Sequence, residues 1–380
     1  MAPNPIFPPF YRGNRRHPLY NNQYERKILF LRSGVPPDVF LQNLRGCKIK
    51  ELKYLRGLNA FVGLFPRNPY TDNFLRHPDI FQIDEDLEVK ILIPFKGTIV
   101  NRSQVIPWGI ERIGAEKAWP VTQGQGVRVA VIDTGIAFDH SDLNRNVKGG
   151  TNILNSFLPP YDHNGHGTHV AGTIGALNNQ LGVVGVAPKV DLFAVKAFKK
   201  DGTAKLSDII NAIDWSIENK MDIINMSFGF NEPSPTFREA VIRANQAGIL
   251  MIAASGNKGT RGMLEYPAQF NETVAVSSIN ENNEISKFST IGPGIDLTAP
   301  GEKIMSTWLN NSFRELSGTS MSVAHVTGVA ALLMSRYPKL PASEINYILK
   351  GYARKLQNSS YIAQGAGLVN AAVFQEAAEY

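Results

Sequence analysis

Two kinds of hydrophobic pattern alternate along the chain from about residue 127 onward. Short apolar runs, typical of strands buried on both faces, occur at residues 127–133, 192–197, 223–226, 249–254 and 273–276. Longer segments with apolar residues at helical spacing lie between them, at 206–219 and 236–247. Another helix is expected from Ser320 to about Tyr337, because Pro338 would end it. The alternation predicts an α/β fold in three layers, a parallel sheet with helices on both faces.

The N-terminal quarter of the chain has a different pattern. Residues 1–25 are rich in Pro, Asn, Arg and Tyr without periodicity, which predicts a disordered basic tail. Strand, helix, strand, helix and strand are then expected in that order, at residues 27–32, 37–44, 60–65, 71–77 and 89–94. This order indicates a small α+β domain at 26–102, in front of the α/β domain at 103–380.

The positive charge of the chain is concentrated in this N-terminal part. The whole chain has 39 Lys and Arg against 33 Asp and Glu, and residues 1–102 hold 16 of the basic and 9 of the acidic residues. The remainder is therefore near neutral, which fits a separable N-terminal domain. The basic part lacks regularly interleaved aromatic residues, so we expect a solvated surface and no nucleic-acid partner.

Three further features limit the class of protein. Cys47 is the only cysteine, so no intrachain disulfide can form. The longest apolar stretch, 326–334, is too short to cross a bilayer, and no membrane partner is expected. Residues 1–16 lack the apolar core of a signal peptide, which predicts a cytoplasmic protein. The alternative is secretion by another route, or a different start residue.

Three glycine-framed segments supply the groups of a nucleophilic triad. Asp133 lies in Val-Ile-Asp-Thr-Gly, His166 in Asn-Gly-His-Gly-Thr-His, and Ser320 in Ser-Gly-Thr-Ser-Met. A serine hydroxyl needs an adjacent base, histidine titrates near neutral pH, and a carboxylate holds the imidazole in one tautomer. We therefore expect Ser320 as nucleophile, His166 as general base and Asp133 as its orienting partner. The order Asp, His, Ser is one of the known chain orders for this geometry.

Each segment also has a simpler interpretation. Asp133 ends a predicted strand, where an aspartate is often a turn residue, and Ser320 can simply cap the following helix. The three-residue spacing of His163, His166 and His169 is compatible with zinc binding, and a zinc hydrolase is the rival enzyme. Two glycines between these histidines argue against a rigid helical ligand face. The three segments in combination favour the triad.

These segments resemble those of the subtilisin-like serine proteases, and the resemblance extends over about residues 104–380. It implies a subtilisin-like catalytic domain and a serine endopeptidase that hydrolyses protein or peptide substrates through an acyl-enzyme. Asn257, in Ala-Ala-Ser-Gly-Asn, matches the side-chain donor of the oxyanion site, with the backbone N–H of Ser320 as second donor. The matching substrate-binding strand contains Ser227, Phe228 and Gly229.

One position departs from the family pattern. Subtilisin-like enzymes usually have Pro before the histidine that follows the nucleophile, whereas this chain has Ala324 before His325. Alanine restores a backbone N–H, so we expect a slightly different helix start. The alternative function is a weakly active or inactive relative that acts as a binding or regulatory protein. The presence of all three triad residues favours an active endopeptidase.

The resemblance also implies a calcium site. Calcium prefers hard oxygen ligands, including backbone carbonyls. The implied ligands are Gln104, Asp142, Asn179 and the carbonyl groups of Leu177, Leu181 and Val183. A plain Asn-rich turn is the alternative for this segment.

By the same resemblance, the N-terminal domain is a subtilisin-type propeptide, an intramolecular inhibitor that the enzyme removes autocatalytically. A cut after Arg102 would make Ser103 the first mature residue. A rival cut follows Leu92. The stretch Leu-Ile-Pro-Phe that starts there resembles the Leu-Ile-Pro-Tyr inhibitory segment of intracellular subtilisins, in which Pro blocks productive cleavage.

Glu265 aligns with the base of the first specificity pocket of the family, where many relatives have a small residue. A carboxylate at that place would favour Lys or Arg at P1, the substrate residue before the cleaved bond. The alternative is a solvated charge on the pocket rim.

Overall fold

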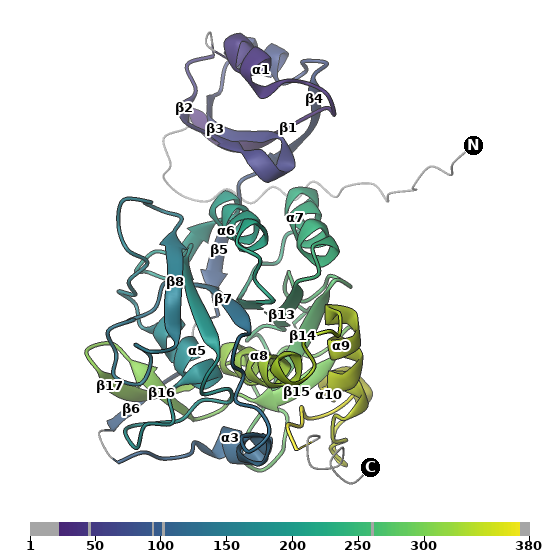
Figure 1. Ribbon diagram of the computed structural model, residues 1–380. Helices are drawn as coiled ribbons and strands as arrows, with labels where there is room; N and C mark the ends of the chain where they lie inside the picture. Colours follow the sequence, from purple (N-terminus) through teal and green to yellow (C-terminus); the bar gives the residue numbers. More distant parts are fainter. Residues whose placement is uncertain (1–22, 45–46, 93–94, 101–102, 260–261, 373–380) are drawn as a thin grey trace.

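A parallel sheet forms the centre of the larger part of the molecule. The computed structural model describes residues 23–372 except 45–46, 93–94, 101–102 and 260–261 (Figure 1). Within this part, the sheet has the order β15-β14-β13-β11-β7-β9-β8 and all neighbouring strands run parallel. Its strands are β7 (Arg128–Asp133), β8 (Val147–Asn152), β9 (Asp191–Lys196), β11 (Ile223–Met226), β13 (Leu250–Ala254), β14 (Thr273–Ile279) and β15 (Leu297–Pro300). The predicted α/β fold class is confirmed.

Helices cover both faces of this sheet, because successive strand residues point to opposite sides. On β7, Val129 and Val131 belong to the core beneath one set of helices, while Ala130 and Ile132 belong to the core beneath the other. The first set contains α5 (His166–Gly175), α8 (Thr319–Arg336) and α9 (Ala342–Gly351). The second set contains α6 (Leu206–Glu218) and α7 (Pro235–Gln246).

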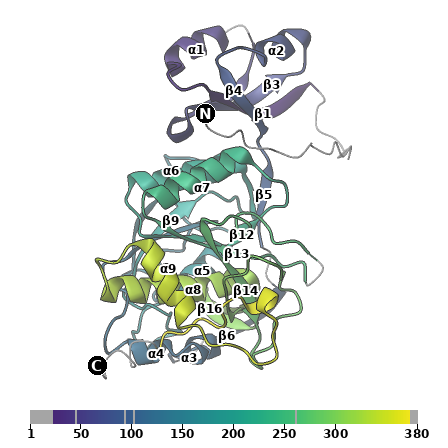
Figure 2. The same ribbon diagram turned by 90° about the vertical axis from the view of Figure 1, so that its right-hand side faces the viewer.

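The N-terminal part is a four-stranded antiparallel sheet with the order β2-β3-β1-β4. Its elements are β1 (Tyr24–Leu31), α1 (Pro37–Leu44), β2 (Lys50–Leu55), the 3-10 turn Arg56–Leu58, β3 (Ala60–Pro66), α2 (Pro69–Phe74) and β4 (Ile80–Glu85). One face of the sheet forms a separate core with Phe40 of α1. The other face contributes Ile28, Phe30 and Val62 to the core of α6 and α7, on which the N-terminal sheet rests (Figures 1 and 2).

The sequence-based prediction for this domain was wrong in its last strand. Strand β5 (Glu88–Ile91) does form, but it lies between β10 (Thr203–Lys205) and β12 (Phe228–Gly229) of the larger part. The fourth strand of the N-terminal sheet is instead β4. Strands β2 and β4 were missed because charged and polar residues interrupt their apolar pattern. Pairing with the neighbouring strands stabilises them despite this pattern.

Carboxylates of β4 and the turn after it hold the two parts together. The Asp86 carboxylate accepts hydrogen bonds from the backbone N–H and hydroxyl of Ser207, both at 2.8 Å, in the first turn of α6. The Asp84 carboxylate accepts the N–H of Thr236 at 2.9 Å in the first turn of α7. Unpaired N–H groups and the helix dipole favour negative charge at these places.

The remaining elements complete the rim of the molecule. A three-stranded antiparallel sheet of order β16-β17-β6 lies below the central sheet in Figure 1. The other elements are β6 (Phe95–Val100), α3 (Trp108–Arg112), α4 (Ala115–Ala118), β16 (Ile304–Trp308), β17 (Ser312–Ser317) and α10 (Tyr361–Gln364). No helix in the described residues has the length and apolar character needed to span a membrane.

Candidate active site

Asp133 and His166 form a buried pair beyond the carboxyl ends of the parallel strands. Asp133 ends β7, and His166 is the first residue of α5. Nδ1 of His166 lies 2.8 and 2.9 Å from the two carboxylate oxygens of Asp133, and each residue is 1% exposed. Both neighbouring oxygens accept hydrogen bonds, so Nδ1 carries the proton. In the neutral imidazole Nε2 is then a free acceptor, the form that a general base needs.

The turn before α5 sets the position of His166. Gly165 has φ +107°, and a Cβ there would collide with the ring of Trp308. The carboxylate of Asp162 accepts the backbone N–H groups of Gly165 and Thr168 at 3.0 Å, so it caps the start of the helix. Asp162 is a positioning residue that sequence reasoning missed, although it lies four residues before His166.

Ser320 occupies the first turn of α8, which packs against α5. Its hydroxyl lies 3.1 Å from the carbonyl oxygen of Ser227 and 3.5 Å from that of Leu92, and the residue is fully buried. Nε2 of His166 is buried and has no hydrogen-bond partner among the described residues. The hydroxyl therefore donates to a backbone carbonyl in this arrangement, while the imidazole acceptor stays available.

Asn257 presents an unused donor beside the serine. Its carboxamide oxygen accepts the backbone N–H of Thr319 at 3.0 Å and the hydroxyl of Thr319 at 2.9 Å. Its Nδ2 is buried and has no hydrogen-bond partner in the described residues. A buried N–H donor without an acceptor is energetically costly. An oxyanion site requires such a free donor, because the negatively charged oxygen of the transition state becomes its acceptor. Thr319 was missed in the sequence, although it adjoins Ser320.

Strand β5 of the chain itself leads to Ser320. Strand β5 is antiparallel to β12, with Ile91 opposite Phe228 and Lys90 opposite Gly229. The next residue, Leu92, donates its N–H to the Ser227 carbonyl at 3.4 Å. The backbone of β5 therefore runs along Ser227, Phe228 and Gly229, the strand expected to bind substrate, and brings the Leu92 carbonyl to the serine hydroxyl.

Comparisons with known proteins agree with this geometry. The model of the subtilase family matches residues 124–367. The chain is 43% identical over 308 residues to a thermostable alkaline protease of Halalkalibacterium halodurans, covering 81% of this chain and 83% of the relative. It is 41% identical over 272 residues to subtilisin DY of Bacillus licheniformis, covering 70% and 98%, and 42% over 295 residues to M-protease of Shouchella clausii, covering 77% and 73%.

The chain belongs to the subtilase family. It is thus an enzyme of the subtilisin-type serine peptidase class. Because subtilases share the described arrangement of a parallel sheet with flanking helices, the family assignment and the fold support each other.

The three histidines of the rival zinc interpretation have different partners in this subtilase. His169 is fully buried, and its Nε2 lies 3.0 and 2.9 Å from the carbonyl oxygens of Ile304 and Arg314. Nε2 therefore carries a proton and is not a free metal ligand. Burial lowers the pKa of His169 to about 3. His163 is exposed and packs its ring edge-on against Tyr161. The three imidazoles therefore contact different groups: His166 the Asp133 carboxylate, His169 two backbone carbonyls and His163 the ring of Tyr161.

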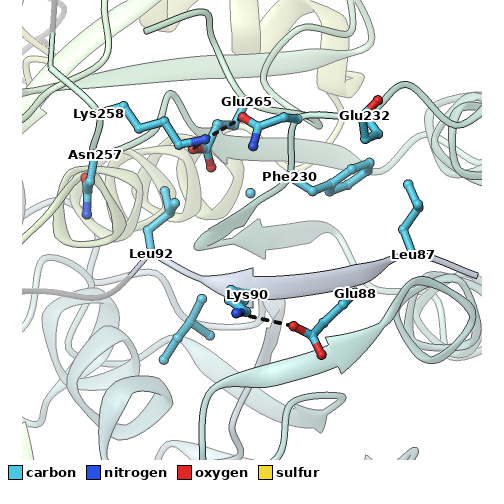
Figure 3. Close-up of a pocket in the computed structure, with 12 residues that line it drawn as sticks. Leu87, Glu88, Lys90, Leu92, Phe230, Glu232, Asn257, Lys258 and Glu265 are labelled. Carbon is cyan, nitrogen blue, oxygen red and sulfur yellow. Dashed lines mark hydrogen bonds and ion pairs between the residues drawn. The ribbon is translucent and has the colours of Figure 1, made fainter. Parts of the chain in front are cut away.

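Glu265 lines the wall of a cavity of about 480 Å³ next to β5 (Figure 3). The residue is only 3% exposed, so the interpretation as a solvated rim charge is wrong. Its carboxylate pairs with the ammonium of Lys258 at 2.8 Å. The sequence-based preference for Lys or Arg at P1 treated this carboxylate as unpaired, and Lys258 was not considered.

The six residues implied as calcium ligands gather around one loop. Asp142 is fully buried and accepts hydrogen bonds from the Asn179 amide and the Val183 N–H, both at 3.0 Å. Nε2 of Gln104 points at the carbonyl oxygens of Leu177 and Val183, at 2.9 and 3.4 Å. Leu181 donates its N–H to the Asn179 side chain at 2.9 Å. Burial raises the pKa of Asp142.

The sequence-predicted cut after Arg102 cannot be compared with the site, since Arg102 lies outside the described residues. Ser103, which follows it, forms an isolated bridge with Leu181. Leu92, the rival position, lies at the serine.

Proposed function

We propose that the chain is a serine endopeptidase made as a zymogen, with Asp133, His166 and Ser320 as its catalytic triad. One observation carries the proposal: a strand of the chain's own N-terminal part pairs with β12 like a substrate, with the Leu92 carbonyl 3.5 Å from the Ser320 hydroxyl. Asp133 and His166 form a buried pair, and Nε2 of His166 has no hydrogen-bond partner among the described residues. A binding protein without peptidase activity would not need this alignment of groups.

The mechanism follows from which atoms are free. The Ser320 hydroxyl turns from the Ser227 carbonyl toward the free Nε2 of His166, which takes its proton as the oxygen attacks the substrate carbonyl. Asp133 stabilises the imidazolium that results. The developing oxyanion accepts hydrogen bonds from Nδ2 of Asn257 and the N–H of Ser320, at the N-terminus of α8. His166 then protonates the leaving amine, and water hydrolyses the acyl-enzyme by the same route.

We infer that maturation cuts the bond between Leu92 and Ile93. The Leu92 N–H pairs with Ser227 in the manner of a P1 residue, and β5 supplies the preceding substrate positions. After this bond, β6 pairs with β17, so the chain is held both before and after it. The same contacts make the N-terminal part an inhibitor until it leaves. Of the two cuts that the sequence predicts, this proposal takes the one after Leu92.

Two measurements test these proposals. A serine-directed covalent reagent should label Ser320 in the matured wild type and leave Ser320→Ala unlabelled. N-terminal sequencing of matured wild-type protein should begin at Ile93, while Ser320→Ala stays full length. Absence of labelling would refute the peptidase proposal. A mature chain that begins at Ser103 would refute only the cut after Leu92.

We propose further that the loop of Asp142 and Asn179 binds calcium. The donor set fits: a fully buried carboxylate and several carbonyl oxygens converge, and half-turn rotations of the Gln104 and Asn179 amides would add two more oxygens. A bound ion would cross-link Gln104, near the start of the larger domain, to the 177–183 loop.

Calcium binding predicts a calcium-dependent thermal stability. In the Ser320→Ala background, which prevents self-digestion, excess calcium over chelator should raise Tm, since the ion binds only the folded state. A ligand at about 100 times its Kd adds about 2.7 kcal/mol. Asp142→Asn should lose this increase, whereas Asp139→Asn, a nearby surface carboxylate, should retain it. Equal Tm values with calcium and with chelator would contradict the site.

A further inference from the structure

A buried lysine lies next to the proposed triad and has no part in the mechanism described above. Lys196 ends β9 and is only 7% exposed. In the parallel pairing of β7 with β9 it stands opposite Asp133. Leu192 and Ala194, at alternate positions of β9, belong to the core beneath α5. Lys196 therefore projects from the same face of the sheet, toward the helix that begins with His166.

The ammonium of Lys196 is surrounded by negative groups. It donates a hydrogen bond to the backbone carbonyl oxygen of Thr134. Burial lowers the pKa of Lys196, and the carboxylates of Asp162 and Asp133 oppose this effect. A buried ammonium is costly unless opposite charges compensate it. The two carboxylates therefore supply the counter-charge of Lys196.

The same two carboxylates hold His166 in place. The carboxylate of Asp133 accepts the proton on Nδ1 of the imidazole, and that of Asp162 caps the turn that leads into α5. The backbone beside Lys196 also fixes Asp133, whose carbonyl oxygen accepts the N–H of Ala197 at 3.0 Å. A charge at Lys196 thus acts on the imidazole through the groups that position it.

The charges around the imidazole can be counted. Asp133 and Asp162 each contribute a negative charge, and Lys196 contributes a positive charge. The other imidazole of α5, His169, is neutral, because burial lowers its pKa to about 3. Without Lys196, the two negative charges would favour the imidazolium form of His166. The base would then be unable to accept the serine proton over a wider range of pH.

We propose that Lys196 is a positioning residue for catalysis, an internal cation that balances the carboxylates of Asp133 and Asp162. By this balance it keeps His166 in the neutral form that can accept the Ser320 proton. An apolar side chain of similar length would fill the same space but would not balance the charges. This inference rests on the proposed peptidase function.

The test measures the pH dependence of kcat/KM for the matured wild type and for variants of Lys196. The substrate is a quenched peptide with Val-Lys-Ile-Leu before the cleaved bond, the order of residues 89–92. Rates are divided by the amount of protein that a serine-directed covalent reagent labels. A variant that folds poorly then has fewer labelled molecules, but the pH at which its kcat/KM is half-maximal does not move for that reason.

The neutral variants Lys196→Met and Lys196→Gln should both move the acid-side midpoint of kcat/KM to higher pH. The expected shift is about one pH unit, the size of the effect of a nearby, partly buried unit charge. Lys196→Arg, which keeps the charge, should stay within about 0.3 pH unit of the wild type. Lys199→Gln is the matched control. It removes an exposed lysine three residues further on, whose charge is screened by solvent, and should leave the midpoint in place.

Two results would overturn the role of Lys196. The first is an acid-side midpoint that stays in place in both neutral variants. The second is an equal shift in Lys196→Arg, because packing and not charge would then be responsible. Wild type that is labelled and active, with unmoved midpoints in the variants, overturns this inference alone. Wild type that is neither labelled nor able to cleave the peptide overturns the peptidase function and this inference with it.

Discussion

At the scale of single residues, the site depends on which polar atoms are already occupied. Both acceptor directions of the Asn257 carboxamide oxygen are used by Thr319, which leaves Nδ2 to face the reaction. The same reasoning assigns the proton of His166 to Nδ1. Hydrogen-bond partners therefore define the roles of these residues more sharply than their identity does.

Because Nδ2 of Asn257 has no hydrogen-bond partner in the described residues, the effect of removing this amide can be predicted. Asn257→Ala should lower kcat about a hundred- to a thousandfold with little change in KM, which is the size of the loss when subtilisin itself lacks its oxyanion-site asparagine. Thr319→Val removes one of the two bonds that orient the amide, and should lower kcat about fivefold. Steady-state kinetics on a P1 Leu peptide would measure both. A loss that appears in KM instead of kcat would contradict the oxyanion role.

The sequence was most informative for residues carried on local motifs. Asp133, His166, Ser320 and Asn257 each lie in a short glycine-framed segment, so residue type and order sufficed to nominate them. Leu92 was named from the stretch Leu-Ile-Pro-Phe as a rival cut, but its position at the serine could not be found in this way. That position comes from the pairing of β5 with the distant strand β12, which no local pattern encodes.

At the scale of elements, the C-terminus of β7 and the N-termini of α5 and α8 carry the three residues of the proposed triad. Five strands of the central sheet have a clear apolar run and were predicted. The two edge strands of that sheet, β8 and β15, were missed, as were β2 and β4 of the N-terminal sheet, and β5 was assigned to the wrong sheet. An apolar pattern indicates that a strand will be buried, but it does not indicate which strand it will pair with.

The helix caps supplied by the N-terminal part predict how firmly it is held. In the full-length Ser320→Ala protein, Asp84→Asn should weaken the contact with α7 by about 1 kcal/mol, because a charged cap becomes neutral. Hydrogen exchange should then rise across β1 to β4 and stay unchanged in the central sheet. Glu85→Gln, an exposed carboxylate between the two capping residues, is the control. Equal effects of both variants would argue against capping.

At the scale of the whole molecule, two fully buried histidines make stability depend on pH. Burial lowers the pKa of His169 to about 3 and that of His325 to about 4. Both values lie below the unfolded value of about 6.5, so the unfolded chain binds more protons between these limits. Stability is therefore complete above about pH 6.5 and is lost as pH falls toward 4, by up to about 1.4 kcal/mol per pH unit and per histidine.

Urea unfolding of Ser320→Ala at pH 7.5 and pH 5 would measure this loss. The unfolding free energy should be lower at pH 5. His325→Asn should reduce the difference between the two pH values, and His163→Gln, which alters an exposed histidine, should not. A difference that is unchanged in His325→Asn would show that other groups govern the acid sensitivity.

The pairing of β6 with β17 has a consequence for the order of events in maturation. If the bond after Leu92 breaks, the pairing of β5 with β12 and of β6 with β17 still holds both new chains on the enzyme, which keeps them at a high effective concentration relative to each other. The acyl-enzyme can then be resealed as readily as it is hydrolysed. Maturation would become irreversible only when one of the two strands dissociates. The lifetime of the nicked complex, and not the rate of bond cleavage, would then set the time at which activity appears.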